Sequence, residues 1–149
     1  MKISPFMSKA IAEAVAAANR GEVPIGAVLV DSEGKVLAAA GNRTEELSDP
    51  TAHAEILAIR AACAARGDPR LPDCDLWVTL EPCAMCAQAI SNARIRRLYY
   101  GAYDAKGGGV DHGARVFSQT TCHHRPEVYG GIDEERTAAL LKEFFASKR

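Results

Sequence analysis

LWVTLEPCAMC, residues 76–86, joins a short apolar segment directly to a pair of cysteines. Leu76 to Leu80 has the length and apolar character of a buried strand. Pro82 follows it, and proline is favoured in the first turn of a helix because its missing N–H would have no partner there. We therefore expect a strand, a tight connection and a helix whose first turn carries both Cys83 and Cys86.

A His-Ala-Glu sequence, residues 53–55, precedes this pair and opens a second expected helix, from about Thr51 to Arg66. One imidazole and two thiolates suit Zn²⁺ and leave its fourth tetrahedral position free for water. Both ligand groups fall at expected helix N-termini, where the helix dipole lowers the pKa of a thiol. Glu55 should point to another side of this helix than His53. We therefore expect it to act as a base beside the metal rather than as a ligand.

Other interpretations of the cysteine pair stay open. A C-x-x-C sequence after a strand also describes a thioredoxin-like redox pair, although such a pair needs no His-Ala-Glu elsewhere in the chain. A purely structural zinc site needs a fourth ligand, for which Cys122, His123 and His124 are the candidates. In that case the chain would be a zinc-stapled binding module without catalysis.

Size and composition predict one globular domain, residues 1–149, with 48% hydrophobic and 25% charged residues. The net charge of −1 carries no nucleic-acid signal. No apolar run is long enough to span a bilayer, and Met1 to Pro5 does not begin a signal peptide. With five cysteines, an odd number, we expect free or metal-bound thiols in the cytoplasm and no membrane association.

The remaining apolar pattern predicts a three-layer α/β domain with a mixed sheet. Glu127 to Tyr129 is either a short fifth strand or an extended loop, so the sheet has five strands or four. The other expected elements are a helix from Phe6 to Ala18 that stops at Gly21, a hairpin of Pro24 to Val30 and Val36 to Gly41, a helix that ends near Asn92, a strand from Leu98 to Ala102, and a final helix from near Asp133.

The H-x-E…P-C-x-x-C pattern is the known signature of zinc-dependent nucleobase deaminases. Through it, the sequence resembles the cytidine/deoxycytidylate deaminase superfamily over nearly its whole length. Asn42, the Thr-Leu-Glu-Pro run at 79–82 and Asp-Ala-Lys at 104–106 resemble the branch of bacterial deaminases that act on tRNA adenosine. The resemblance implies the cytidine-deaminase-like α/β/α fold and a homodimer.

This resemblance also implies an activity and its residues. His53, Cys83 and Cys86 would bind one zinc ion, and Glu55 would shuttle protons while adenosine becomes inosine at the wobble position of a tRNA anticodon stem-loop. The residues implied to contact the substrate are Asn42 and Ala54 at the base edge, Val23 on the base face, and Asp104 and Lys106 at flanking nucleotides.

One segment departs from the branch. Residues 107–115, Gly-Gly-Gly-Val-Asp-His-Gly-Ala-Arg, lack the Gly-Ser-Leu-Met stretch common there, and His123 stands where the branch often has Asn. This loop borders the expected RNA side rather than the zinc, so the departure concerns substrate recognition. The alternative function keeps the zinc chemistry and changes the substrate to a free nucleobase or nucleoside, such as guanine or cytosine.

Overall fold

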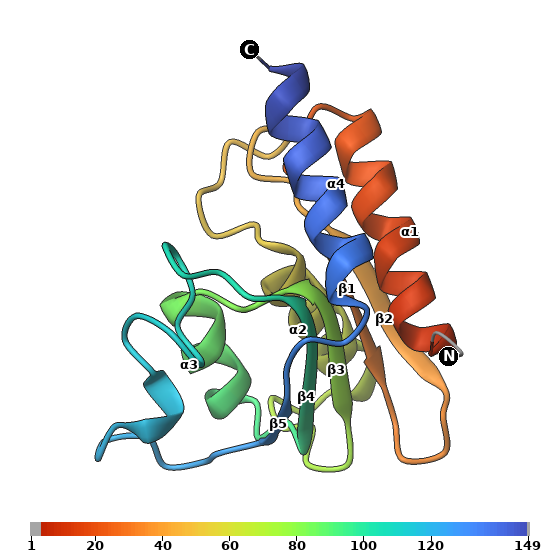
Figure 1. Ribbon diagram of the computed structural model, residues 1–149. Coiled ribbons are helices and arrows are strands. Elements are labelled where there is room, and N and C mark those ends of the chain that lie inside the picture. Colours follow the sequence, from red (N-terminus) through yellow and green to blue (C-terminus); the bar gives the residue numbers. More distant parts are fainter. Residues whose placement is uncertain (1–3, 149) are drawn as a thin grey trace.

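A mixed five-stranded sheet with helices on both faces forms the frame of the protein in the computed structural model, which describes residues 4–148 (Figure 1). The predicted three-layer α/β class is confirmed, and Glu127–Tyr129 is the fifth strand. In chain order the elements are α1 (Pro5–Asn19), β1 (Gly26–Val30), β2 (Val36–Gly41), α2 (Ala54–Arg66), β3 (Asp75–Leu80), α3 (Ala84–Asn92), β4 (Arg97–Ala102), the 3₁₀ helix η1 (Val116–Ser118), β5 (Glu127–Tyr129) and α4 (Glu134–Ser147).

The order of the strands, β2-β1-β3-β4-β5, brings two loops of the chain together. β1 is antiparallel to both β2 and β3, whereas β3, β4 and β5 run parallel to one another. The carboxyl ends of parallel strands meet at the same edge of a sheet. The residues after β3 therefore lie beside those after β4, and the N–H of Glu81 donates to the Ala102 carbonyl (2.8 Å).

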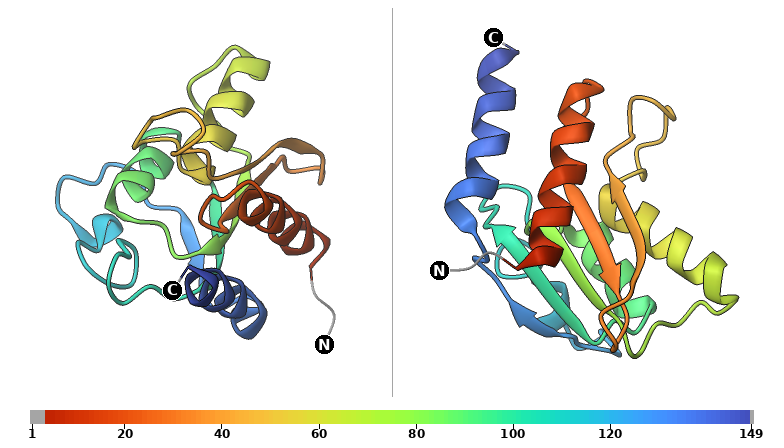
Figure 2. Two further views of the ribbon diagram at one scale, coloured as in Figure 1. Left: turned by 90° about the horizontal axis from the view of Figure 1, so that it is seen from above. Right: turned by 90° about the vertical axis from the view of Figure 1, so that its right-hand side faces the viewer.

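The two faces of the sheet are covered by different pairs of helices. α1 and α4 lie side by side on one face, and α2 and α3 lie on the other (Figure 2). On the first face, Met7 and Ile11 of α1 pack against Val28 of β1. α1 approaches β1 closely because Gly26 has no side chain: a Cβ there would overlap the Ala10 carbonyl. The larger core, around Tyr100, lies on the face of α2 and α3.

Two helix starts differ from the prediction. α2 begins at Ala54 rather than Thr51, because the Thr51 hydroxyl and N–H both bond to Asp49 and hold a turn instead (2.7 and 2.8 Å). α3 begins at Ala84, with Cys83 as its N-cap, so Pro82 precedes the cap and is not in the first turn. His53 is likewise the N-cap of α2. Both residues thus stand just before a helix.

No helix in the described part of the chain is long and apolar enough to cross a membrane. Met1 to Ile3, part of the segment interpreted above as lacking a signal peptide, lie outside the described residues.

Candidate active site

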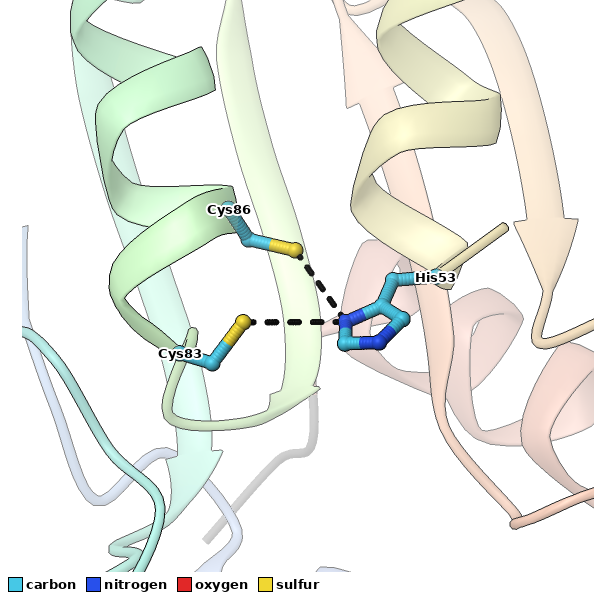
Figure 3. Close-up of side chains that lie close together, drawn as sticks. All are labelled: His53, Cys83 and Cys86. Atoms are coloured by element: carbon cyan, nitrogen blue, oxygen red, sulfur yellow. Dashed lines mark hydrogen bonds between the residues drawn. The ribbon is translucent and has the colours of Figure 1, made fainter. Parts of the chain in front are cut away.

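Three side chains with metal-ligating atoms converge between the starts of α2 and α3 (Figure 3). Nδ1 of His53 lies 3.6 Å from Sγ of Cys83 and 3.4 Å from Sγ of Cys86. Zinc–sulfur and zinc–nitrogen bonds at a tetrahedral angle place the two ligand atoms roughly 3.5 Å apart. The spacing therefore fits a Zn²⁺ ion that would be bound by all three atoms.

The two thiols of this group differ in acidity. A hydrogen bond from Cys86, assisted by His53, lowers the pKa of Cys83 to about 4. The same bond, together with burial, raises the pKa of Cys86. The hydrogen bond between the two sulfurs therefore favours a thiolate at Cys83 and a thiol at Cys86. A divalent cation in place of the thiol proton would hold both sulfurs as thiolates.

Glu55 is 4% exposed and lines the same cavity as His53 and Cys83, but it is not one of the three grouped ligands. The expectation that His53 and Glu55 point to different sides of one helix assumed that both residues are helical. This assumption is wrong, because His53 has extended backbone angles (φ −73°, ψ 153°). Burial raises the pKa of Glu55, which suits a group that both accepts and returns a proton during the reaction.

The candidates for a fourth protein ligand lie elsewhere. Cys122 is buried beside Ser91 (3.5 Å), and Nε2 of His124 lies 2.6 Å from the Ile95 carbonyl. Within residues 4–148, no fourth His, Cys, Asp or Glu completes the group. Three protein ligands with one open position are typical of catalytic zinc, whereas structural zinc is usually closed by a fourth ligand.

A cavity of about 220 Å³ is lined by two of the three candidate ligands, His53 and Cys83. This volume is below the ~300–1,000 Å³ of pockets that enclose drug-sized ligands, so it suits one planar base better than a whole nucleotide. Its lining residues are Ile25, His53, Glu55, Leu80, Glu81, Cys83, Asp104 and Gly107.

An apolar groove continues from this cavity toward α4 and has a volume of about 360 Å³. Ile25, Leu80 and Asp104 line both spaces. At the groove, Tyr103 is 44% exposed and Phe145 is 51% exposed. Exposed aromatic rings next to a base-sized cavity can stack on neighbouring bases of a nucleic acid.

The predicted substrate residues are distributed around this site. Asp104 lines the cavity and the groove, and Val23 lines the groove. Asn42 is buried, and its Oδ1 accepts a hydrogen bond from the N–H of Ala54 (2.9 Å), so these two residues form a bonded pair. Lys106 is exposed and lines neither space.

Replacing Asn42 with Ala should lower the free energy of unfolding by about 1–3 kcal/mol, because the buried N–H of Ala54 loses its acceptor. Asn42→Asp keeps an acceptor oxygen at that position and should recover most of the loss. Urea denaturation of both variants measures the difference. Equal destabilisation by the two substitutions would show that the bond to Ala54 is not the cause.

Two buried glutamates that no sequence pattern singled out hold the loops around the site. Glu22 accepts hydrogen bonds from the N–H groups of Glu45 and Glu46 (3.1 and 2.8 Å), and Glu81 accepts several from the loop after β4. Burial alone would raise the pKa of both carboxyls, but the N–H donors outweigh it, so both pKa values lie below their usual range. One feature of the sequence could have indicated their burial: each glutamate adjoins an apolar segment. Glu22 directly precedes Val23 to Val30, and Glu81 directly follows Leu76 to Leu80.

Comparison with known proteins adds independent evidence. Residues 1–102 match the zinc-binding region of cytidine and deoxycytidylate deaminases. The tRNA-specific adenosine deaminase of Agrobacterium fabrum is 62% identical over 144 residues, which cover 97% of this chain and 94% of that protein. A solved structure from a study of A-to-I editing by tRNA:A34 deaminases at the wobble position has 63% identity and a TM-score of 0.89, and covers 91% of this chain and 98% of its own.

A second similar solved structure is that of a deaminase with a different substrate. The guanine deaminase of Bacillus subtilis has 31% sequence identity and a TM-score of 0.67. The match covers 99% of this chain and 94% of that one.

Proposed function

The chain belongs to the family defined by the zinc-binding region of cytidine and deoxycytidylate deaminases, and from this membership we propose that it converts adenosine to inosine at the wobble position of tRNA. The reaction is hydrolytic and zinc-dependent, and it releases ammonia. The observation that carries the proposal is a set of three ligands at zinc spacing beside a buried glutamate, in a cavity sized for one base.

His53, Cys83 and Cys86 would hold the zinc ion, which when bound supplies a polarised water molecule as the nucleophile. With its charge neutralised by two thiolates, the ion would acidify water less than it would at an all-histidine site, so the reaction needs a base from the protein. Glu55 would take the proton of the water and deliver it to the ring nitrogen next to the amine-bearing carbon. It would then take the proton of the newly added hydroxyl group and pass it to the amino group, which leaves as ammonia when the C–N bond breaks.

The substrate is proposed to be an anticodon stem-loop, because its loop presents unpaired bases that can leave their stack at low cost. The target base would enter the cavity, with the Asn42–Ala54 pair at its edge and Val23 on its face. Neighbouring nucleotides would lie along the groove, near Tyr103 and Asp104. Lys106, exposed on the same loop, would meet the phosphate backbone.

The rival function is deamination of a free base or nucleoside. Two observations favour it: the small cavity and the similarity to a guanine deaminase structure. The deciding assay compares inosine formation in an anticodon stem-loop with ammonia release from adenine, guanine, cytosine and adenosine. We expect turnover of the stem-loop alone. Turnover of free bases without any inosine in the RNA would make the tRNA assignment wrong.

Affinity for the stem-loop should depend steeply on salt, because cationic side chains that contact phosphates release counterions. With about three phosphate contacts, the affinity should fall about twenty- to fortyfold as salt rises fourfold. Fluorescence anisotropy with a labelled stem-loop measures this slope. A dissociation constant that does not change with salt would contradict a polynucleotide substrate.

We also propose that the chain forms one domain and acts as a cytoplasmic homodimer. Its five cysteines are free thiols, as expected in a reducing compartment. Between α2 and α3, Ile56, Ile59 and Ala89 line an apolar groove that a second copy could cover. Sedimentation equilibrium at micromolar concentration tests the dimer, and a monomer mass would exclude it.

A further inference from the structure

Glu81 has the most densely hydrogen-bonded carboxylate near the site, although its side chain is 0% exposed. Its Oε1 accepts from the N–H of Asp104 (3.0 Å) and lies 2.8 Å from Nδ1 of His112. Its Oε2 accepts from the N–H groups of Val110, Asp111 and His112 (3.2, 2.9 and 3.1 Å). Every one of these partners belongs to residues 103–113, the loop after β4, here named the β4 loop.

The same loop also packs directly on the start of α3. The N–H of Gly109 donates to the Pro82 carbonyl (2.8 Å). A Cβ at Gly109 would lie 2.5 Å from the Ala84 nitrogen, and a Cβ at Gly108 would lie 2.5 Å from the Glu81 carboxyl. The glycine run that departs from the related branch thus has a physical reason. It lets the β4 loop approach both Glu81 and the helix that carries the cysteines.

The β4 loop carries Tyr103, Asp104 and Lys106, the residues of the chain that the proposed function places against nucleotides beside the target base. Asp104 and Gly107 line the cavity, and Tyr103 lines the groove. Without its anchor, this glycine-rich segment would sample many conformations, and substrate binding would have to order it. The anchor therefore reduces the entropy lost when RNA binds.

We infer that Glu81 is a positioning residue for the RNA: it fixes the β4 loop against α3 so that Tyr103, Asp104 and Lys106 face the substrate in a preformed arrangement. The inference rests on the proposed function. Glu81 itself faces the loop backbone through its carboxylate. A carboxylate is required because both oxygens must accept, and a glutamine would turn an N–H₂ group toward N–H donors.

Glu81→Gln should raise KM for the anticodon stem-loop about tenfold or more, whereas kcat should change by less than about threefold. Zinc content should stay at one ion per chain, because the three ligands are unchanged. Asp75→Asn is the matched control. Asp75 is a mostly buried carboxylate at the other end of β3, bonded to Arg96 (3.0 Å), so its loss should affect stability without raising KM.

Two further variants test the anchor if Glu81→Gln fails to fold. Gly108→Ala crowds the Glu81 carboxyl, and His112→Ala removes the ring contact while all four N–H donors remain. Both should raise KM for the stem-loop, the second by a smaller factor. His112→Asn places an amide N–H near the position of Nδ1 and should restore the wild-type KM, a rescue that a general loss of packing would not allow.

The inference is overturned if Glu81→Gln binds and turns over the stem-loop with wild-type KM. It is also overturned if kcat and zinc content fall together at constant KM. Glu81 would then support the cysteines at the start of α3 instead of the β4 loop. The proposed function has a separate readout. If the wild-type protein forms no inosine in any stem-loop, the function fails, whereas an active wild type with an unaffected variant rejects the role of Glu81 alone.

Discussion

Replacing Glu55 with Ala is expected to slow inosine formation by about a thousandfold or more, while the chain keeps one zinc ion. Glu55 lines the cavity beside His53 and Cys83, and burial raises its pKa. Without it, no positioned group takes a proton from the water or returns one to the leaving ammonia. Single-turnover rates on the stem-loop, with elemental analysis of each preparation, measure both quantities.

Glu55→Gln should be as inactive as Glu55→Ala, because an amide keeps the shape of the side chain but cannot shuttle a proton. Glu33→Gln is the control, since Glu33 is an exposed carboxylate in the turn between β1 and β2. If Glu55→Gln retains even a tenth of the wild-type rate, the proton carrier is another group. Loss of zinc from Glu55→Ala would place the residue among the ligands.

Replacing Cys86 with Ser should abolish both zinc binding and turnover. Cys86 is completely buried, and its sulfur lies 3.4 Å from the His53 nitrogen, so a hard and weakly acidic hydroxyl would replace a thiolate inside the ligand group. Because metal binding stabilises only the folded chain, the melting temperature of the variant should also no longer rise when zinc is added. Elemental analysis and thermal denaturation with and without zinc measure these effects.

Cys63→Ser provides the matched control, because Cys63 is a free thiol on the same pair of packed helices but outside the ligand group. It should keep both zinc and turnover. Treating the wild type with a chelator should reproduce the Cys86→Ser behaviour, and adding zinc back should reverse it. A zinc-loaded and active Cys86→Ser protein would refute the three-ligand site.

Periodic segments were predicted well because their pattern is local. The apolar spacing of α1 and the stop at Gly21, where φ is +85°, both occur in the structure. The starts of α2 and α3 were predicted less well. The start of α2 depends on whether a side chain bonds to a neighbouring turn. At Thr51 the bonds to Asp49 prevail over helix formation. That local competition moves His53 out of the helix and turns it toward Cys83.

The sequence alone determined the type of chemistry and the class of fold. An imidazole, two thiols and a carboxylate at this spacing are specific, because few other combinations of side chains bind zinc and leave one position open. The pattern of strands and helices predicted the three-layer arrangement, because the periodicity of apolar residues shows which face of each element is buried.

Only the tertiary structure decided how the loops around that chemistry are held. Glu81 can anchor the β4 loop because β3 and β4 run side by side. This pairing places its carboxylate against a loop that begins more than twenty residues later in the sequence. The bond between Asn42 and Ala54 likewise joins a strand end to a helix start across the site. Such contacts are set by the packing of distant segments, and no local pattern of residues encodes which N–H group a buried oxygen will meet.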